Sequence, residues 1–565
     1  MFNYMISEKR FFERRILMHR MLSLLLIFSI LASAAPTGHA APSSLTMLQS
    51  QGKNIVNADG KIVQLRGVNA GGWLVQESWM CLTNAPSQME AFSVLDARFG
   101  RETREHLFKV YEDHYWKESD FDNIKALGMN VVRLPITWWH VLDENGVLRS
   151  DAFDRLDWFV SCCEERNLYV VLDLHAAPGS QNGNDHSGDI TGSFLWKNQE
   201  HQDRTVYLWE QIATHYKGNP VIAAYDLLNE PGGDLNSTNA MQWEFFDRLY
   251  KAIRTIDPDH IIMMESCWDP EGLPPPDRYG WENVVYQYHY YKWNADNDYN
   301  AQKLFTDVKL YKINHTNHPV PSFVGEFTLF QSMDAWKYAL QAYSNAGLSW
   351  TIWTYKVTGN STWGLYNVYG EKADIYKDSA EEIERKWTVQ GEMRRNTQLC
   401  QVVADILAGH PVELPEESSA RSSSPIFSLT FSSVSATKTA AIRQEGSSHR
   451  LTTLKSIDPQ DFMNAICFKL QETQDTSSYN YLTFFINDLQ GSNTHKVTLI
   501  DAYGKSVSKW VDIPSVHREW TRINVPLSMF SEIDLKNLSE IRIGEWNKGD
   551  YLIDRLFLCN GSMDE

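Results

Sequence analysis

The sequence is poor in features that mark several common classes of protein. Its 565 residues include only 7 cysteines, whose spacing matches no metal-ligand pattern, and an odd number cannot all pair within one chain. Cys467 and Cys559 could form a bridge, although nothing in the spacing requires one. Basic residues are fewer than acidic ones, and the resulting net charge of -19 argues against nucleic acid as a partner. We therefore expect neither a metal centre nor a disulfide-dependent fold.

Long hydrophobic runs are scarce, and the longest marks a targeting segment. Residues 22–32 are apolar, follow several basic residues, and lead to small residues ending at Ala40. This pattern predicts a secretory signal at residues 1–40, and the run is short for a membrane-spanning helix. We expect a secreted or extracellular protein without membrane contact after cleavage. A periplasmic or cell-surface location and an uncleaved anchor remain alternatives.

Short apolar runs alternate with amphipathic segments in residues 41–410. Eight strands are expected, at 63–68, 131–135, 169–174, 222–228, 260–265, 284–288, 322–325 and 349–353. Helical periodicity occurs at 120–127, 153–165, 205–217 and 241–256. The alternation predicts a (β/α)8 barrel, a TIM barrel of the α/β class. A doubly wound sheet is the alternative, weakened because no glycine-rich phosphate loop follows the first strand. A small hairpin is expected at residues 51–66, turning at 57–60.

The composition changes after the barrel. Residues 411–425 are rich in proline, serine and glutamate and are interpreted as a linker. Helical periodicity then disappears, and short apolar runs separated by polar turns continue through residues 426–565. This spacing predicts a C-terminal antiparallel β-sandwich.

Polar residues stand at the carboxyl ends of the expected barrel strands. All such ends meet at one rim of a barrel, which is where active sites of this fold form. The candidate site residues at these ends are Arg133, His175, Asn229, Glu230, His289, Tyr291, Glu326 and Trp353. Trp350 and Tyr355 compete with Trp353 for its place, and Glu265 is given no role.

Two of these residues, Glu230 and Glu326, suggest glycoside hydrolysis. Two carboxyl groups about 5 to 5.5 Å apart can cleave a glycoside with retention, one as nucleophile and the other as acid and then base. The acid is expected to stay protonated through partial burial and neighbouring negative charge. The nucleophile is expected to stay ionised beside Arg133 and Tyr291.

Six motifs in order resemble glycoside hydrolase family 5. They are Arg66-Gly67-Val68-Asn69, Val132-Arg133-Leu134-Pro135, Leu172-Asp173-Leu174-His175, Leu228-Asn229-Glu230-Pro231, His289-Tyr290-Tyr291 and Val324-Gly325-Glu326. Residues 66–75 and 174–183 resemble the exo-β-1,3-glucanase (glucan β-glucosidase) branch. The resemblance covers about residues 50 to 405.

The resemblance implies a role for each candidate. Glu230 would be the acid/base and Glu326 the nucleophile, and these two are the catalytic residues. Asn229 would contact the 2-hydroxyl of the sugar, and Arg133 and Tyr291 would hold the nucleophile. The substrate-binding set is completed by His175, His289 and Trp353, with the Trp353 ring as the floor of the sugar site.

The sequence departs from the family at two places. Ala176 replaces a usual glycine, and Asn184 stands where fungal exo-glucanases often carry a phenylalanine. That phenylalanine grips the departing glucose unit, so its loss puts exo-1,3 preference in question; Trp293 could substitute. No role is predicted for Asp185 or His186. In the C-terminal region, Glu519-Trp520-Thr521-Arg522-Ile523-Asn524-Val525-Pro526 followed by Tyr551-Leu552-Ile553-Asp554 resembles β-sandwich carbohydrate-binding modules, with a purely structural sandwich as the alternative.

Together these features predict a secreted, retaining hydrolase of β-glucans, with exo-β-1,3-glucanase action favoured. An endo-β-glucanase and a β-1,6-glucanase are the alternatives among enzymes, and a non-catalytic glucan-binding protein is the alternative from another class. The expected partner is a β-glucan polysaccharide or oligosaccharide. No cofactor and no metal are expected, and the chain is expected to be a monomer.

Overall fold

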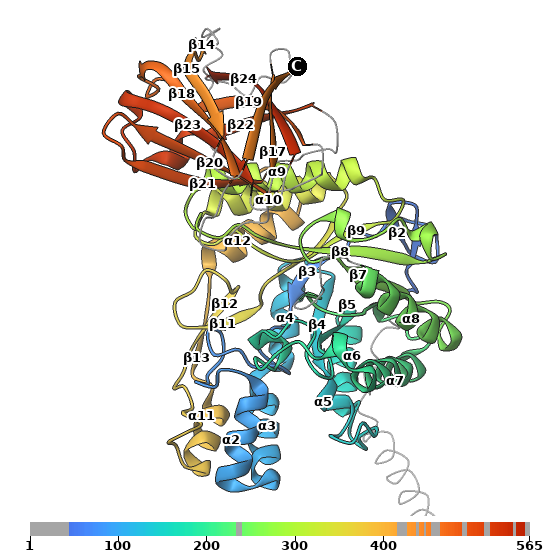
Figure 1. Cartoon of the computed structure of the whole chain (residues 1–565). Coiled ribbons are helices and arrows are strands. Elements are labelled where there is room, and N and C mark those ends of the chain that lie inside the picture. The colour runs from blue at the N-terminus through green and yellow to red at the C-terminus, as the bar shows by residue number, and fades with distance from the viewer. Residues whose placement is uncertain are drawn as a thin grey trace, which may run out of the picture. The chain divides into compact units, whose positions relative to one another are not determined.

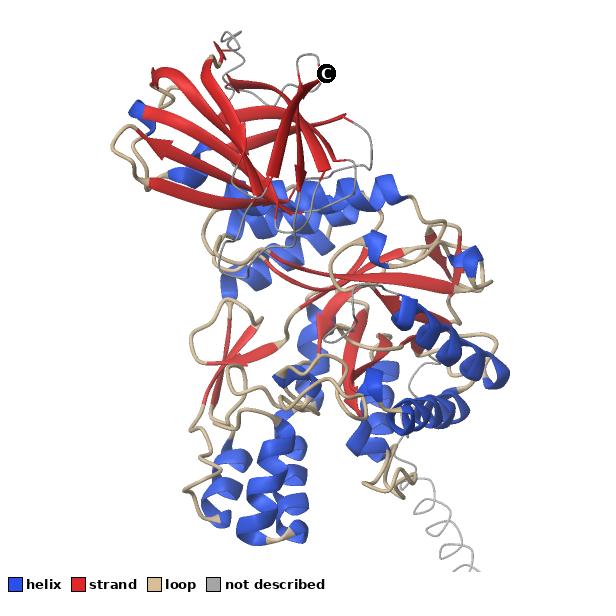
Figure 2. Cartoon of the chain, in the orientation of Figure 1, coloured by secondary structure: helices blue, strands red, loops and turns tan. Residues whose placement is uncertain are grey.

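The computed structural model is described for residues 45–232, 240–414, 427–436, 440–445, 448–453, 464–488, 494–512, 520–545 and 550–559. Figure 1 shows the course of the chain and Figure 2 its helices and strands. The expected signal peptide and most of the expected linker lie outside these residues. Within them, no helix has the length and apolar character needed to cross a membrane.

A closed barrel of eight parallel strands forms the centre of the first region. The strands are β3 (Arg66–Asn69), β4 (Val131–Thr137), β5 (Tyr169–Ala176), β6 (Ile222–Asp226), β7 (Ile261–Glu265), β8 (Val284–Tyr291), β9 (Ser322–Thr328) and β10 (Ser349–Ile352). They pair in chain order, and β10 closes the barrel against β3 through Trp350 and Arg66. All residues of β4 and β5 are buried. A strand covered on both faces has this near-continuous apolar character, so the predicted (β/α)8 fold is confirmed.

Helices alternate with the barrel strands along the chain. They are α2 (Gln88–Phe99), α3 (Arg101–Tyr115), α4 (Glu118–Ala126), α5 (Trp138–Val141), α6 (Asp154–Glu165), α7 (Gln199–Tyr216), α8 (Ala240–Ile256), α9 (Tyr299–Thr316), α10 (Met333–Asn345), α11 (Ala380–Val389) and α12 (Thr397–Leu407). Several begin where a polar side chain accepts a hydrogen bond from a backbone N–H of the first turn. Ser87 caps α2 in this way, and Asn198 caps α7. The four predicted helices correspond to α4, α6, α7 and α8.

Two small sheets accompany the barrel. Strands β1 (Gln49–Gln51) and β2 (Asn54–Val56) pair, and β11 (Lys356–Thr358), β12 (Tyr366–Tyr369) and β13 (Glu392–Arg395) form the other. The expected hairpin is therefore only partly right. Val56 and Ile62 do form a bridge around the predicted turn, but the regular pairing of β2 is with β1. The apolar run around Ile55 has partners on both sides, which the turn residues alone did not indicate.

The C-terminal region contains two antiparallel sheets. One contains β14 (Phe427–Ser428), β16 (Ala440–Glu445), β17 (Ser448–Thr453), β19 (Tyr481–Asp488), β22 (Trp520–Pro526) and β24 (Asp550–Cys559). The other contains β15 (Phe431–Ala436), β18 (Asn464–Gln474), β20 (Thr494–Asp501), β21 (Ser506–Asp512) and β23 (Leu538–Glu545). Alternate residues such as Ile466, Phe468, Phe484 and Ile541 are buried in one apolar core, as expected for packed sheets. The bridge considered between Cys467 and Cys559 does not form, since the Cys467 thiol is free.

Candidate active site

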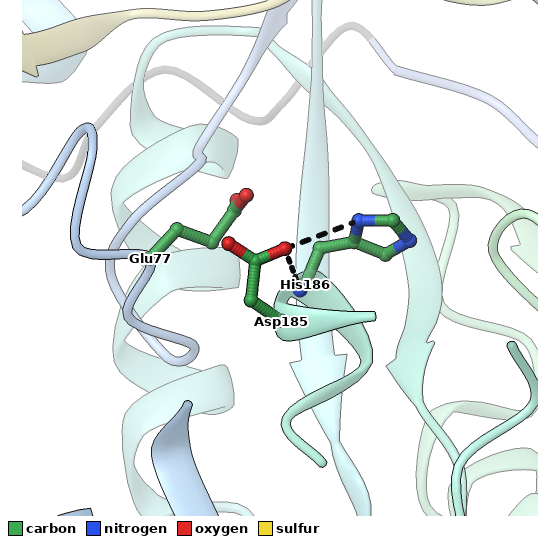
Figure 3. Close-up of side chains that lie close together, drawn as sticks. All are labelled: Glu77, Asp185 and His186. Atoms are coloured by element: carbon green, nitrogen blue, oxygen red, sulfur yellow. Dashed lines mark hydrogen bonds and ion pairs between the residues drawn. The ribbon is translucent and has the colours of Figure 1, made fainter. Parts of the chain in front are cut away.

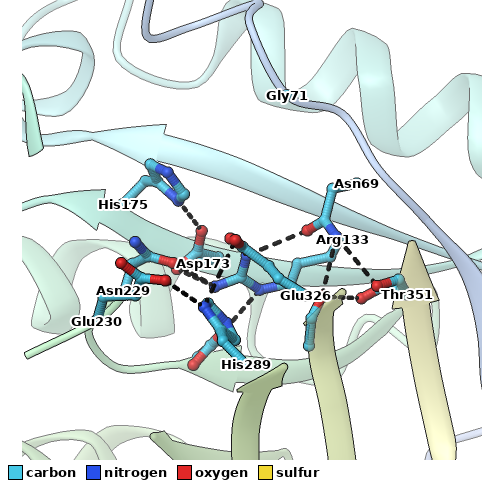
Figure 4. Close-up of polar contacts among 12 residues, drawn as sticks. Asn69, Gly71, Arg133, Asp173, His175, Asn229, Glu230, His289, Glu326 and Thr351 are labelled. Carbon is cyan, nitrogen blue, oxygen red and sulfur yellow. Dashed lines mark hydrogen bonds and ion pairs between the residues drawn. The ribbon is translucent and has the colours of Figure 1, made fainter. Parts of the chain in front are cut away.

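The polar strand ends predicted from the sequence meet at one place in the barrel. Figure 4 shows side chains from β4, β5, β8 and β9 converging with Asn229 and Glu230, which follow β6. Almost all of these polar groups are buried, and Arg133, His289 and Asn229 are each at most 1% exposed. Buried polar groups on this scale need partners. The contacts among them define the site.

The two carboxylates of interest lie close together. One oxygen of Glu230, one of Glu326 and a nitrogen of His289 all lie within 4.8 Å of one another. Glu326 belongs to β9 and is 5% exposed. Glu230 has a left-handed backbone conformation, with φ of 41°, which is uncommon for a side chain of this size. The backbone N–H of Glu230 donates to Glu265 Oε2 at 2.9 Å and so anchors this turn.

Arg133 contacts several polar residues of the site. Its guanidinium donates to Glu326 Oε1 at 2.8 Å, to Asn229 Oδ1 at 2.8 Å and to Asp226 Oδ2 at 2.9 Å. Asp173 Oδ1 is a fourth partner, at 3.0 Å. The planar fork of arginine suits such multiple contacts. Because Asn229 Oδ1 accepts from Arg133, the amide N–H groups of Asn229 are the ones left to face a ligand.

Tyr291 and Arg133 hold Glu326 from two sides. The Tyr291 hydroxyl donates to Glu326 Oε2 at 2.7 Å, while Arg133 donates to Oε1. Both oxygens of this carboxylate therefore receive a hydrogen bond, which fixes the orientation of the carboxylate. The Tyr291 ring lies 5.7 Å from that of Trp293 and 5.6 Å from that of Trp363. Trp293 is 56% exposed, so an aromatic surface leads outward from this carboxylate.

His289 lies among three carboxylates. Its Nδ1 is 2.9 Å from Glu230 Oε1, 3.4 Å from Glu265 Oε1 and 3.5 Å from Glu326 Oε2. Burial alone would lower the pKa of His289, but the charges of Glu265 and Glu326 and the hydrogen bond with Glu230 raise it to about 9. Burial alone would raise the pKa of Glu230, but the hydrogen bond from His289 and the charge of that ring lower it to about 2.

The proton of this pair therefore resides on His289. This differs from the expectation that burial and negative neighbours keep Glu230 protonated. The physical reason is the cation beside it, which sequence patterns did not place.

His175 and Trp353 form a flat wall beside the carboxylates. Their rings stack at 5.4 Å with an interplanar angle of 4°. His175 Nδ1 hydrogen-bonds to Asp173 at 2.7 Å, and burial lowers its pKa to about 3, so the ring is neutral. Its Nε2 is buried without a protein partner. The competing rings Trp350 and Tyr355 are instead fully buried, and their polar atoms contact Ser344 and Asp120.

Sequence reasoning missed several buried polar residues of the site. They are Asn69, Asp173, Asp226, Glu265 and Gln287. Gln287 donates to Asp226 at 2.9 Å and to Glu265 at 3.2 Å, and burial raises the pKa of Glu265. The available signal was the two-residue alternation of strands: Asp173 precedes His175 by two residues, and Gln287 precedes His289 by two.

A second missed group lies next to Glu230. Glu77, Asp185 and His186 place one donor atom each within 4.8 Å of the others (Figure 3). Glu77 is buried, its Oε2 accepts from the Trp79 indole, and burial raises its pKa to about 7. His186 Nε2 lies 3.3 Å from Glu230 Oε2. Both this group and that of Glu230, His289 and Glu326 have metal-ligand chemistry, but hydrogen bonds already engage most of their donors, and we assign an ion to neither.

The chain is similar to one family model and to several known proteins. A model of the cellulase family (glycosyl hydrolase family 5) matches residues 87–359. A beta-xylosidase of Phanerodontia chrysosporium is 31% identical over 349 residues, which is 56% of this chain and 72% of that protein. A probable glucan 1,3-beta-glucosidase A of Neosartorya fischeri is 32% identical over 235 residues, 40% of this chain and 56% of that protein. The match thus spans little more than half of the latter relative. A crystal structure of endogalactoceramidase aligns with a TM-score of 0.47 at 16% identity, covering 90% of this chain and 100% of that chain.

Proposed function

Because this chain belongs to glycoside hydrolase family 5, we propose that it cleaves β-glucosidic bonds in β-glucans with retention of configuration, as an exo-β-1,3-glucanase. The observation that carries the proposal is the closeness of the Glu230 and Glu326 carboxylates, within 4.8 Å. This separation suits a retaining enzyme, whereas an inverting enzyme needs about 6.5 to 9.5 Å to admit a water molecule.

In the first proposed step, Glu326 attacks the anomeric carbon while the glycosidic bond breaks. A glycosyl ester forms on Glu326, and the leaving oxygen takes a proton from Glu230. The proton reaches Glu230 from His289 across their 2.9 Å hydrogen bond. In the second step Glu230 removes a proton from water, the water oxygen bonds to the anomeric carbon, and the ester breaks. Glu326 is then restored.

The remaining candidates would bind the sugar. The free amide N–H groups of Asn229 suit the 2-hydroxyl, and the unpartnered Nε2 of His175 suits another hydroxyl. Trp353 supplies a flat apolar face for the sugar ring. Trp293 and Trp363 lie beyond Tyr291 and would contact the departing unit, replacing the aromatic that Asn184 does not provide.

Linkage and mode of attack are tested by product analysis. Purified protein is incubated with laminarin, pustulan and carboxymethyl-cellulose, and products are followed by chromatography from the first minutes. Glucose alone from laminarin is the expected result. Mixed oligomers from the outset would reject exo action in favour of an endo-β-glucanase, and faster release from pustulan would favour a β-1,6-glucanase. Because one relative is named a beta-xylosidase, nitrophenyl β-xyloside is compared with nitrophenyl β-glucoside.

The His289–Glu230 pair predicts a specific pH dependence. Activity requires the proton that the pair holds, so it is lost as pH rises through the raised pKa of His289, about 9. In His289→Gln the imidazole that holds this proton is gone, so Glu230, whose side chain is 14% exposed, must hold it itself. We expect the alkaline limb of kcat/KM to move to lower pH by about one to two units.

The measurement is kcat/KM on laminaribiose from pH 4 to 10. His106→Gln is the matched control because His106 is exposed on α3 and pairs with Glu384, far from the carboxylates in sequence and contacts. An alkaline limb that stays in place in His289→Gln would show that His289 does not hold the proton.

A further inference from the structure

His186 contacts Glu230 and has no assigned role. It lies in a short 3-10 turn, Asp185–Ser187, and its side chain is 18% exposed. Its Nε2 is 3.3 Å from Glu230 Oε2 and 2.7 Å from Asn182 Nδ2. The same ring nitrogen thus faces an amide donor and a carboxyl group. Whether this nitrogen carries a proton must therefore be compatible with both neighbours.

The orientation of the Asn182 amide is fixed by two backbone groups. The backbone N–H of Asn184 donates to Asn182 Oδ1 at 2.9 Å. Asn182 Nδ2 lies 3.1 Å from the carbonyl oxygen of Glu230, which can only accept. Flipping the amide would set donor against donor at one end and acceptor against acceptor at the other. The amide nitrogen therefore faces Glu230 and His186, and its second hydrogen points to the His186 ring.

It follows that His186 Nε2 accepts a hydrogen bond. An imidazole nitrogen that accepts carries no proton, so the ring is neutral with its proton on Nδ1. Nδ1 faces Asp185 Oδ1 at 3.9 Å, which is consistent with that tautomer. The electron-rich Nε2 then opposes an ionised oxygen of Glu230 and favours a protonated one.

The groups that face His186 are the carboxyls of Asp185, Glu77 and Glu230 and the neutral ring of His175, which is centred 6.0 Å away. A proton on Nε2 would have to displace the Asn182 N–H. With the proton on His289, the ionised oxygen of Glu230 faces the electron-rich Nε2 of neutral His186. Moving that proton from His289 to Glu230 removes this opposition, so the neutral ring favours the acid form of Glu230.

We propose that His186, held by Asn182, is a positioning residue that keeps Glu230 protonated until Glu230 gives its proton to the leaving oxygen. This inference rests on the proposed role of Glu230 as acid. It predicts that His186 matters when the leaving group needs a proton. It matters little when the leaving group departs as a stable anion.

The test compares two substrates in three variants. Laminaribiose needs protonation of its leaving oxygen, and 2,4-dinitrophenyl β-glucoside does not. His186→Asn is expected to lower kcat on laminaribiose about tenfold, a part of the 10²–10⁴ that general acid catalysis supplies, and to change kcat on the dinitrophenyl substrate less than about twofold. KM stays within about twofold, and the alkaline limb of kcat/KM moves to lower pH. Asn182→Ala gives the same pattern, and the double variant is no worse than His186→Asn.

Three outcomes would overturn the inference. Equal losses on both substrates, or a change confined to KM, would make His186 a structural or sugar-binding residue. Additive losses in the double variant would show that Asn182 does not act through His186. His106→Asn, on an exposed histidine of α3, serves as control.

The proposed function is tested by the same substrates. A wild-type protein inactive on both would remove that function and the inference together. If wild type is active and Glu230→Ala loses laminaribiose hydrolysis but keeps its kcat/KM on the dinitrophenyl substrate, which reports the first step alone, the acid assignment stands. If His186→Asn does not then lose laminaribiose hydrolysis selectively, as Glu230→Ala does, the inference is rejected and the proposed function stands.

Discussion

Replacement of Glu326 by alanine is expected to lower kcat on laminaribiose by roughly 10⁴-fold or more, since the covalent intermediate can no longer form. The protein should remain folded, because Arg133 keeps its contacts with Asn229, Asp173 and Asp226. The smaller side chain also leaves space beside the anomeric carbon. A small anion such as azide can enter that space and attack from the side that Glu326 occupied.

The stereochemistry of azide rescue separates the two carboxylates. With Glu326→Ala and an activated aryl β-glucoside, a single displacement should give α-glucosyl azide. With Glu230→Ala, Glu326 still forms the ester, and azide then replaces it from the opposite face to give β-glucosyl azide. Proton NMR of the product distinguishes the anomers. Glu384→Ala is the control because Glu384 is exposed on α11.

Either of two results would contradict the assignment. Full activity of Glu326→Ala would remove it from the chemistry. The β-azide from Glu326→Ala together with the α-azide from Glu230→Ala would exchange the two roles. Circular dichroism of each variant shows whether a loss of activity reflects unfolding.

The barrel could be predicted from sequence because each of its strands carries its own signal. Runs such as residues 169–174 and 222–228 are apolar apart from one aspartate each, a pattern that suits a strand covered on both faces. The predicted ends were right to within about three residues. The hairpin near Ile55 was harder, because an isolated apolar triplet does not specify which neighbour pairs with it.

The candidate site was predictable where a polar residue ends an apolar run in the sequence, and less so where it lies within the run. Glu230 and Glu326 stand out because a carboxylate ends an apolar run. Asp173 and Gln287 lie within such runs, and only the inward alternation of β5 and β8 identifies them. The contact of His186 with Glu230 had no sequence signal, since it depends on the conformation of a loop.

The proton arrangement was the least predictable property. Whether Glu230 carries a proton depends on three-dimensional distances to His289, Glu265 and His186, and differences of a few tenths of an ångström decide which group holds it. Burial and nearby negative charge were inferred correctly in kind. The cation at 2.9 Å reverses their combined effect on Glu230.

Replacement of Arg133 by methionine is expected to produce the largest loss of stability, roughly 3–5 kcal/mol at pH 7, as for breaking a buried ion pair. The side chain is fully buried with Asp173, Asp226 and Glu326 around it. Methionine fills much of the volume but leaves these carboxylates without a counter-charge. Arg133→Lys should be less harmful but still damaging, since a single ammonium cannot serve every partner of the guanidinium. Both variants should lose activity.

The pH dependence of this loss identifies its cause. Burial raises the pKa of Asp173 and of Asp226 to about 6, although Arg133 opposes the rise. Folding therefore takes up protons, and the stability that these groups contribute is present below their unfolded pKa and lost as pH rises through about 6. Without Arg133 both pKa values rise further, so the loss at neutral pH becomes larger. The free energy of unfolding of Arg133→Met should be closest to that of wild type near pH 4 and should fall steeply below it toward pH 7.

Urea unfolding of the intact chain at pH 4, 5.5 and 7, followed by tryptophan fluorescence, measures this difference. Arg101→Met is the matched control: Arg101 forms exposed ion pairs with Glu105 and Glu144, which are worth about 0–1 kcal/mol. Adding Asp226→Asn to Arg133→Met should recover part of the stability at pH 7, because it removes one uncompensated charge. A loss of equal size at pH 4 and pH 7 would instead assign the effect to packing. In that case, the positive charge of Arg133 would not be the cause of the position of Glu326.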